Sequence, residues 1–66
     1  MSLSMYFGWM IDITFSPDDN EYYGTILGAN GEELFETAAY PKRHEVLQAM
    51  HSYAKTHKPP VYNKRK

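Results

Sequence analysis

The chain has 66 residues and forms a single domain, and a domain of this size buries only about 60% of the surface that its unfolded chain exposes. It contains no cysteine, which excludes disulfides, thiolate metal sites and cysteine nucleophiles and is typical of proteins in the reducing cytosol. The first residues lack the basic start and apolar run of a secretory signal, and no apolar stretch approaches the ~20 residues of a membrane span. We therefore expect a cytoplasmic protein with no membrane partner.

Charge is unevenly distributed along the chain. All seven Lys and Arg residues lie at or after Lys42, whereas seven of the eight acidic residues lie at or before Glu36. This separation predicts two surfaces of opposite potential. Such surfaces affect the choice of partner and the solubility of a protein, and do not determine its fold.

The acidic half predicts three strands. Residues 5–15 form the first, because their side chains alternate in polarity and one face carries Trp9, Ile11, Ile13 and Phe15. A polar loop at residues 16–20 precedes a second strand at about residues 21–28, which is rich in β-forming residues. Asn30 and Gly31 then predict a type I′ hairpin turn, because both tolerate positive φ, and a third strand follows at about residues 32–38.

The basic half predicts one amphipathic helix and a tail. Pro41 suits the first turn of a helix, and the expected helix ends near His57, before two prolines. Its apolar side chains recur at helical spacing and comprise Val46, Leu47, Met50, Tyr53 and Ala54. The predicted fold class is therefore α+β, with a three-stranded antiparallel sheet and one helix in a domain at residues 5–55, followed by an extended basic tail at residues 56–66.

Both faces of the predicted sheet carry apolar side chains. Adjacent apolar residues, such as Ile26 and Leu27, point to opposite faces of a strand. A single helix covers only one face, so we expect the other face or a sheet edge to meet a second copy of the chain in a homodimer. The candidate anchors of the core or of the dimer interface are Trp9, Phe15, Leu27 and Phe35.

A set of spaced residues follows a recognisable pattern: Tyr22 and Ile26 in one strand, the run Asn30-Gly31-Glu32, the pair Leu34-Phe35, Tyr40, and Met50 in the helix. In this pattern, residues 7–54 resemble the YegP-like family of small bacterial and archaeal domains. Two positions depart from the family pattern: Gly24 replaces an apolar residue, and Lys42 replaces a small hydroxyl residue before the helix. The resemblance implies a β-β-β-α unit that occurs as tandem repeats or as a self-associating single copy, and it implies no mechanism.

No arrangement of residues predicts an enzyme, a metal site or a cofactor site. Ser52 and His51 are adjacent in the expected helix and point to different sides of it, so they do not form a nucleophile and base pair. His44 and His51 lie about 10.5 Å apart along such a helix, which is too far for them to share one metal ion. We expect a protein without catalytic residues, metal or cofactor.

The basic tail offers two interpretations. Its charged residues, together with the end of the helix, form a set that could contact the phosphates of a nucleic acid, namely Lys55, Lys58, Lys64, Arg65 and Lys66. In the second interpretation, the tail is a solubilising terminus or a strap that pairs with the acidic sheet. Residues 59–62 also match a PPxY ligand of WW domains, a four-residue match to which we give little weight.

The sequence thus favours a small non-enzymatic homodimer that binds a further, unidentified protein. The acidic sheet opposes an extended polyanion, so a nucleic-acid-associated protein that uses its basic arm is the alternative.

Overall fold

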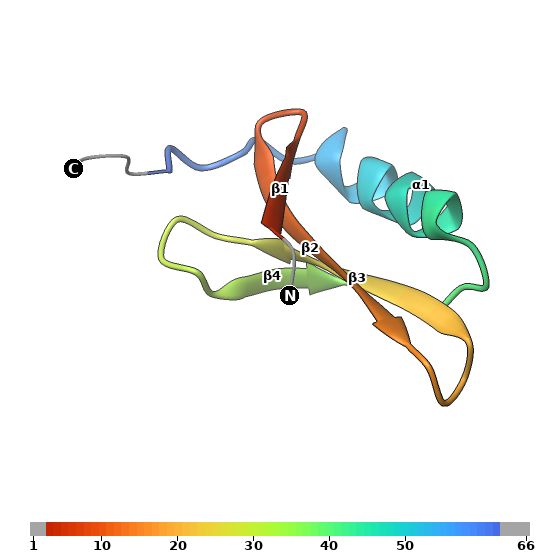
Figure 1. Cartoon of the computed structure of the whole chain (residues 1–66). Helices are drawn as coiled ribbons and strands as arrows, with labels where there is room; N and C mark the ends of the chain where they lie inside the picture. Colours follow the sequence, from red (N-terminus) through yellow and green to blue (C-terminus); the bar gives the residue numbers. More distant parts are fainter. Residues whose placement is uncertain (1–2, 63–66) are drawn as a thin grey trace.

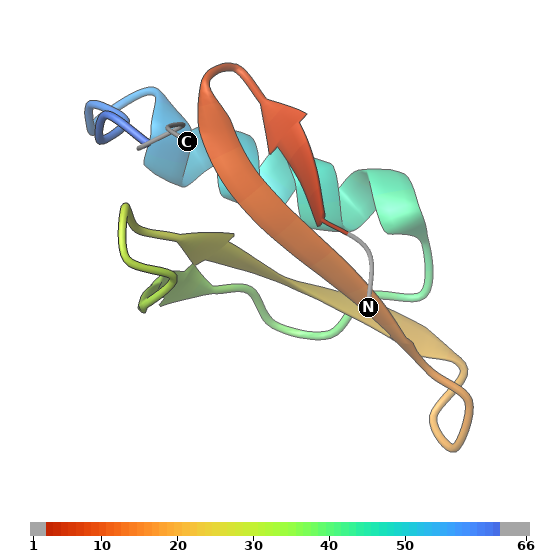
Figure 2. The ribbon, with the colours of Figure 1, turned by 60° about the vertical axis from the view of Figure 1, so that its left-hand side comes forward.

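In the computed structural model, which describes residues 3–62, a four-stranded antiparallel sheet carries one helix on one of its faces (Figures 1 and 2). The elements in chain order are β1 (Leu3–Tyr6), β2 (Trp9–Ser16), β3 (Glu21–Leu27), β4 (Glu33–Glu36) and α1 (Arg43–Ala54). The strands lie side by side in the same order as in the sequence. The prediction of an α+β domain with an antiparallel sheet and one helix is confirmed, and the prediction of three strands is wrong.

The additional strand arises because the predicted strand at residues 5–15 folds as a hairpin. Phe7 and Gly8 form its two-residue turn, with φ values of 51° and 84°. Positive φ at both central residues is the requirement of a type I′ turn, which suits the twist of paired strands. β1 and β2 consequently pair with each other, from Leu3 opposite Asp12 to Tyr6 opposite Trp9.

The turn between β3 and β4 differs from the predicted type I′ turn. Only Gly31 has a positive φ, at 82°, while Asn30 stays in the ordinary negative range. The Gly31 N–H donates to the Gly28 carbonyl at 3.0 Å, and the Gly28 N–H donates to the Glu32 carbonyl at 2.7 Å. This is a type I turn followed by a left-handed glycine, the other common hairpin connection. The register between the two strands then shifts by one residue, so Leu34 forms a bulge in β4. β4 spans Glu33–Glu36 and is shorter than the predicted strand at residues 32–38.

The core lies between the sheet and α1. Its buried apolar side chains come from β2, β3 and α1 and comprise Trp9, Ile11, Ile26, Val46 and Met50. The predicted helical stripe is present, because Leu47, Tyr53 and Ala54 also pack against this cluster. Gly24 allows the close approach of α1 to β3: a side-chain carbon there would collide with Met50 Cε and would lie 2.7 Å from Val46 Cγ1.

The helix is shorter at both ends than the sequence predicted. Lys42, the residue before it, has an extended backbone with φ of −128° and ψ of 143°, so Pro41 precedes the helix and does not lie in its first turn. At the other end the Lys55 N–H donates to the His51 carbonyl at 3.0 Å and the Thr56 N–H donates to the Tyr53 carbonyl at 3.1 Å, and these bonds close the last turn.

The chain between β4 and α1 continues to pair with β3. Thr37 and Gly24 are joined by two hydrogen bonds, from the Thr37 N–H to the Gly24 carbonyl at 2.9 Å and from the Gly24 N–H to Thr37 Oγ1 at 3.0 Å. Tyr22 and Tyr40 exchange two backbone hydrogen bonds of 2.7 and 2.8 Å. The edge of β3 that faces away from β2 is therefore hydrogen-bonded along most of its length. β1 forms the opposite edge of the sheet.

Candidate functional site

The four predicted anchors occupy different environments. Trp9 is only 2% exposed and belongs to the core, and Phe35 is half-buried against the same cluster. Phe15 is 43% exposed at the end of β2, with its ring centroid 5.0 Å from that of Tyr22. Leu27 follows the buried Ile26 and so lies on the helix-free face of the sheet, where it is half-buried. Trp9 and Phe35 therefore anchor the monomer core, and Leu27 is the anchor that faces away from the helix.

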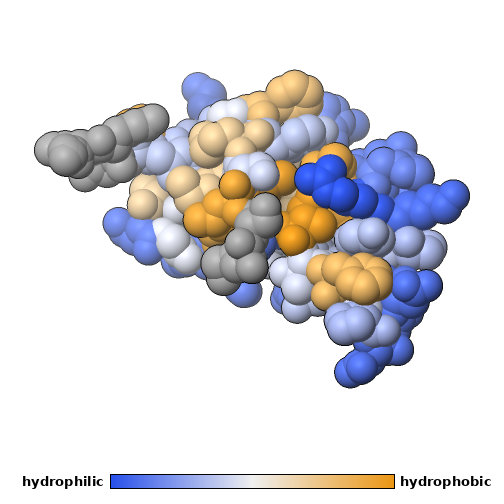
Figure 3. All heavy atoms as spheres, viewed as in Figure 1, coloured by the Kyte–Doolittle hydropathy of each residue, from blue (hydrophilic) through white to orange (hydrophobic). Residues whose placement is uncertain are grey.

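The helix-free face carries an apolar patch at β1. Leu3 and Met5 are 54% and 59% exposed. Together with Met10 they line a shallow hollow of about 220 Å³. Figure 3 shows apolar residues gathered over β1 and the adjacent part of β2. A contiguous exposed apolar patch on a small domain is typical of an interaction site.

The two edges of the sheet differ in how they are protected. β1 contains no charged residue, no proline and no bulge. β4, by contrast, carries Glu33 and Glu36 and is interrupted by the bulge at Leu34. Charges and bulges are the usual means by which an edge strand avoids pairing with another chain. Of the two edges, β1 is the one open to strand pairing.

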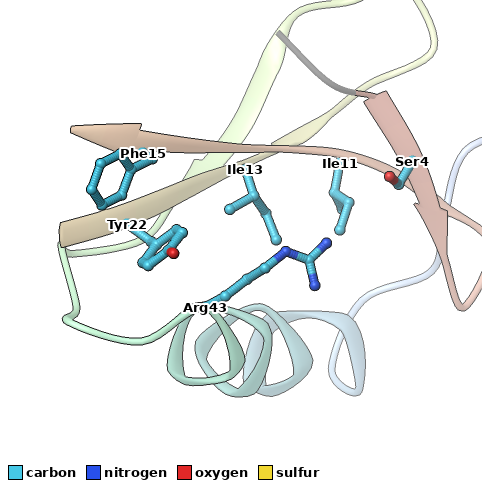
Figure 4. Close-up of a pocket in the computed structure, with 6 residues that line it drawn as sticks. All are labelled: Ser4, Ile11, Ile13, Phe15, Tyr22 and Arg43. Atoms are coloured by element: carbon cyan, nitrogen blue, oxygen red, sulfur yellow. The ribbon is translucent and has the colours of Figure 1, made fainter. Parts of the chain in front are cut away.

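A groove lies on the helix side of the sheet, between β2 and the start of α1 (Figure 4). Its volume is about 140 Å³, and it is lined by Ser4, Ile11, Ile13, Phe15, Tyr22 and Arg43. The Arg43 side chain reaches across the groove toward Ile11, and it makes no hydrogen bond or ion pair with any residue from 3 to 62. The groove therefore combines an apolar floor with one unpaired cation.

Stacked rings explain the position of one histidine. Tyr53 stacks on Phe35 with ring centroids 4.9 Å apart and on His57 with centroids 3.9 Å apart, and it meets Trp9 edge to face at 5.5 Å. His57 Nδ1 also lies 2.9 Å from the Tyr53 carbonyl. His57 thus caps an aromatic column that fixes the end of α1 to the core. Within the described part of the chain, no three His, Asp or Glu side chains form a group that could hold a metal ion.

The described part of the tail packs on the domain. The Tyr62 hydroxyl accepts a hydrogen bond from the Met10 N–H at 3.0 Å and donates one to the Leu27 carbonyl at 2.6 Å. It thereby bridges two residues that lie opposite each other in β2 and β3. Pro59 lies beside the β1–β2 turn, where a side-chain carbon at Gly8 would lie 3.4 Å from Pro59 Cγ. These contacts match the strap interpretation of the tail, although they involve a hydroxyl and a proline in place of charges.

The predicted basic set is only partly described. Lys55 caps the C-terminal end of α1 and Lys58 lies just beyond it, and both are exposed. Lys64, Arg65 and Lys66 lie outside the described residues. Binding of a polyanion through this set stays a prediction.

Comparison with known protein families, with curated proteins and with solved structures finds no match to this chain. The resemblance to YegP-like domains therefore stays a prediction. Within residues 3–62, no helix has the length and apolar character needed to cross a membrane.

Three elements of these surfaces did not follow from the sequence. The predicted strand at residues 5–15 includes Gly8 and so hides the β1 edge, although a glycine between two alternating segments is itself a hairpin signal. The sequence places Tyr62 in the basic arm and in the PPxY match, and neither pattern predicts a hydrogen bond to β2 and β3. No pattern in the sequence places Arg43 over β2.

Proposed function

We propose that this chain is a small non-enzymatic interaction module that forms a homodimer through β1 and the helix-free face of the sheet. The observation that carries the proposal is the exposure of Leu3 and Met5 on an uncharged edge strand. A cytoplasmic location and a further protein partner are part of the same proposal.

Pairing of β1 with β1 of a second copy is supported by charge and by geometry. Two copies of Leu3–Tyr6 can approach in antiparallel order without bringing like charges together, because the strand has none. The unsatisfied N–H and C=O groups of both edges would then bond to each other. The apolar patches of the two copies would join into one surface, whose burial favours association by about 25 cal/mol per Å² before the entropic cost of association.

The mass of the particle in solution tests the proposal. Light scattering or sedimentation at micromolar concentration should give twice the 7.7 kDa mass of the chain. Met5→Asp should shift the particle to a monomer that keeps its circular dichroism spectrum, because Met5 is exposed and does not contribute to the core.

The matched control is Val61→Asp, which adds the same charge at a side chain that is 90% exposed and lies outside β1. This variant should remain dimeric. A wild-type chain that is monomeric and folded at these concentrations, or a Met5→Asp variant that remains dimeric, would contradict the proposal.

A further inference from the structure

The turn between β1 and β2 holds an aromatic residue in an unfavourable backbone conformation. Phe7 has a φ of 51°, and a type I′ turn prefers Asn, Asp or Gly at such a position. The Phe7 side chain is nevertheless 69% exposed, so burial in the core does not account for the choice of residue. A single exposed apolar side chain is ordinary. An exposed ring on a strained backbone is not, and this combination is characteristic of functional positions.

Basic side chains lie around this ring at the C-terminal end of α1, which Figure 1 shows beside the β1–β2 turn. The Phe7 ring meets the His51 ring edge to face, with centroids 5.7 Å apart. Lys55 follows His51 by four residues and therefore lies on the same side of the helix. Lys58 directly precedes the proline that lies beside the turn. Both lysines are exposed, and neither ammonium group forms an ion pair with a residue from 3 to 62. Phe7, His51, Lys55 and Lys58 form what we call the aromatic-basic patch.

The acidic residues of the chain lie away from this patch. Residues 3–11 and 46–62 contain no Asp or Glu. Figure 1 shows the β2–β3 loop, which contains Asp18 and Asp19, at the opposite end of the molecule, and the acidic strand β4 lies at the other edge of the sheet from β1. The negative end of the α1 dipole is partly neutralised, because carbonyls of the last turn accept hydrogen bonds from the backbone N–H groups that follow. A short anionic ligand can therefore bind here without crossing the acidic part of the sheet.

An exposed ring beside two unpaired cations fits a nucleotide better than it fits other partners. A base stacks on an aromatic ring, while the adjoining phosphates bind ammonium groups. The central side chain of a protein interface is instead enclosed by neighbours that exclude water, whereas the neighbours of Phe7 are polar and exposed. A membrane surface would bury only one aromatic side chain, and even a single fatty-acyl chain gives only marginal membrane binding.

We propose that the aromatic-basic patch binds a short segment of single-stranded nucleic acid. One base stacks on the exposed part of the Phe7 ring, and the phosphates beside it contact Lys55 and Lys58. A base and its phosphates are common to RNA and DNA, and stacking alone imposes little sequence preference.

This inference goes beyond the proposed function and is tested separately from it. The dimer proposal uses the outer edge of β1 and the helix-free face, whereas the Phe7 ring contacts α1 on the other face of the sheet. The Met5→Asp variant should therefore keep the nucleic-acid site. A dimer that binds no nucleic acid overturns the inference and leaves the dimer proposal standing.

The test is a titration of the full, isotope-labelled chain with a hexamer of deoxyadenylate at low salt, followed by NMR chemical shifts. We expect saturable changes centred on the amides of Phe7, Gly8, His51 and Lys55. A hexamer of abasic sugar phosphates keeps the charge without the bases and should bind about tenfold more weakly, which is the contribution of one stacked base. A hexamer of riboadenylate should shift the same amides, and a preference for one of the two adenylate hexamers would identify which nucleic acid the site serves.

Two substitutions of Phe7 separate the role of the ring from the role of the turn. Phe7→Asn removes the ring but tolerates positive φ, so the variant should keep its fold and bind the adenylate hexamer about tenfold more weakly. Phe7→Trp restores a stacking surface and should restore binding. Val61→Asn is the matched control, since it removes an apolar side chain that is 90% exposed and lies outside the patch.

The salt dependence of binding tests the two lysines. Lys55→Gln and Lys58→Gln should each reduce the slope of log affinity against log salt by about 0.7, the value for one phosphate contact to a single strand. Lys42→Gln, which removes an exposed cation at the other end of α1, should leave the slope unchanged. Three results would overturn the proposal: no binding by the folded chain at millimolar hexamer, equal binding of the adenylate and abasic hexamers, or a Phe7→Asn variant that binds as tightly as the wild type. Sedimentation with phosphatidylserine vesicles that depends on Phe7, without binding of the hexamers, would overturn it in favour of a membrane surface.

Discussion

Single polar groups stabilise the contacts between segments that are distant in the sequence. The Tyr62 hydroxyl lies between Met10 and Leu27 and completes the hydrogen bonding of both backbone groups at one end of the β2–β3 ladder. Thr37 does the same for Gly24 on the other side of β3, where it is buried. In each case a side chain satisfies a backbone group that another strand does not reach, which avoids the free-energy cost of leaving it unpaired.

Removing the tyrosine hydroxyl tests this role. Tyr62→Phe should lower the free energy of unfolding by about 1–2 kcal/mol, because both partners on the strands lose their hydrogen bond. Urea denaturation followed by circular dichroism measures the change. The control is Tyr23→Phe, since the structure gives the Tyr23 hydroxyl no hydrogen bond within residues 3–62. Equal stability of the two variants would show that the tail does not hold β2 and β3 together.

At the scale of elements, the two hairpins reverse the chain with different turn types. The β1–β2 hairpin places Phe7 and Gly8 both at positive φ, whereas the β3–β4 hairpin needs it only at Gly31. Positive φ is unfavourable for a residue with a side chain, by roughly 1–2 kcal/mol in the left-handed region. The Phe7 ring lies 4.6 Å from the ring of Tyr6 and 5.7 Å from that of His51, contacts that offset part of this cost.

The turn between β3 and β4 makes a prediction about two adjacent residues. Gly31→Val should lower the free energy of unfolding by at least about 1 kcal/mol, because a β-branched residue resists the φ of 82°. Asn30→Ala should change it by less than about 0.5 kcal/mol, since Asn30 has an ordinary φ and the hydrogen bond to Glu32 Oε1 involves its backbone N–H. Thermal denaturation of both variants measures the difference. Comparable losses in the two would instead indicate a type I′ turn.

The helix and β3 were predictable from the sequence because their signals are local. The periodic apolar residues of α1 and the β-forming residues of β3 determine both elements without reference to the rest of the chain. The boundary between β1 and β2 was not predictable, because the alternation of apolar and polar residues continues on both sides of Gly8 and conceals the turn. The groove was not predictable at all, since it depends on how α1 packs beside β2 and on where α1 places Arg43. Such features follow from the packing of elements on one another, which local patterns do not specify.

For the whole molecule, the small size of the domain connects its stability with its association. A sheet covered on one face by a single helix leaves Leu3 and Met5 exposed to water, and no other element within residues 3–62 covers them. A second copy would remove this surface from water. Stability and self-association of the chain should therefore depend on each other.

This dependence predicts a melting temperature that varies with protein concentration. For a dimer, dilution favours the unfolded state by mass action, so the melting temperature should fall steadily as the wild-type chain is diluted. Met5→Asp, which is expected to be monomeric, should show no such trend. Differential scanning fluorimetry over a hundredfold range of concentration measures both. A wild-type melting temperature that is independent of concentration would mean that the monomer is the unit of stability.

The tyrosine bridge also affects the order in which a newly synthesised chain completes its fold. The β1–β2 and β2–β3 hairpins join neighbouring segments and can form as soon as each has left the ribosome. The bond between Met10 and Tyr62 spans 52 positions in the sequence, so it forms only after Tyr62 has left the ribosome. Until then, one end of the β2–β3 ladder stays incomplete. The strands can therefore pair with one another before the side chain that completes their ladder is available.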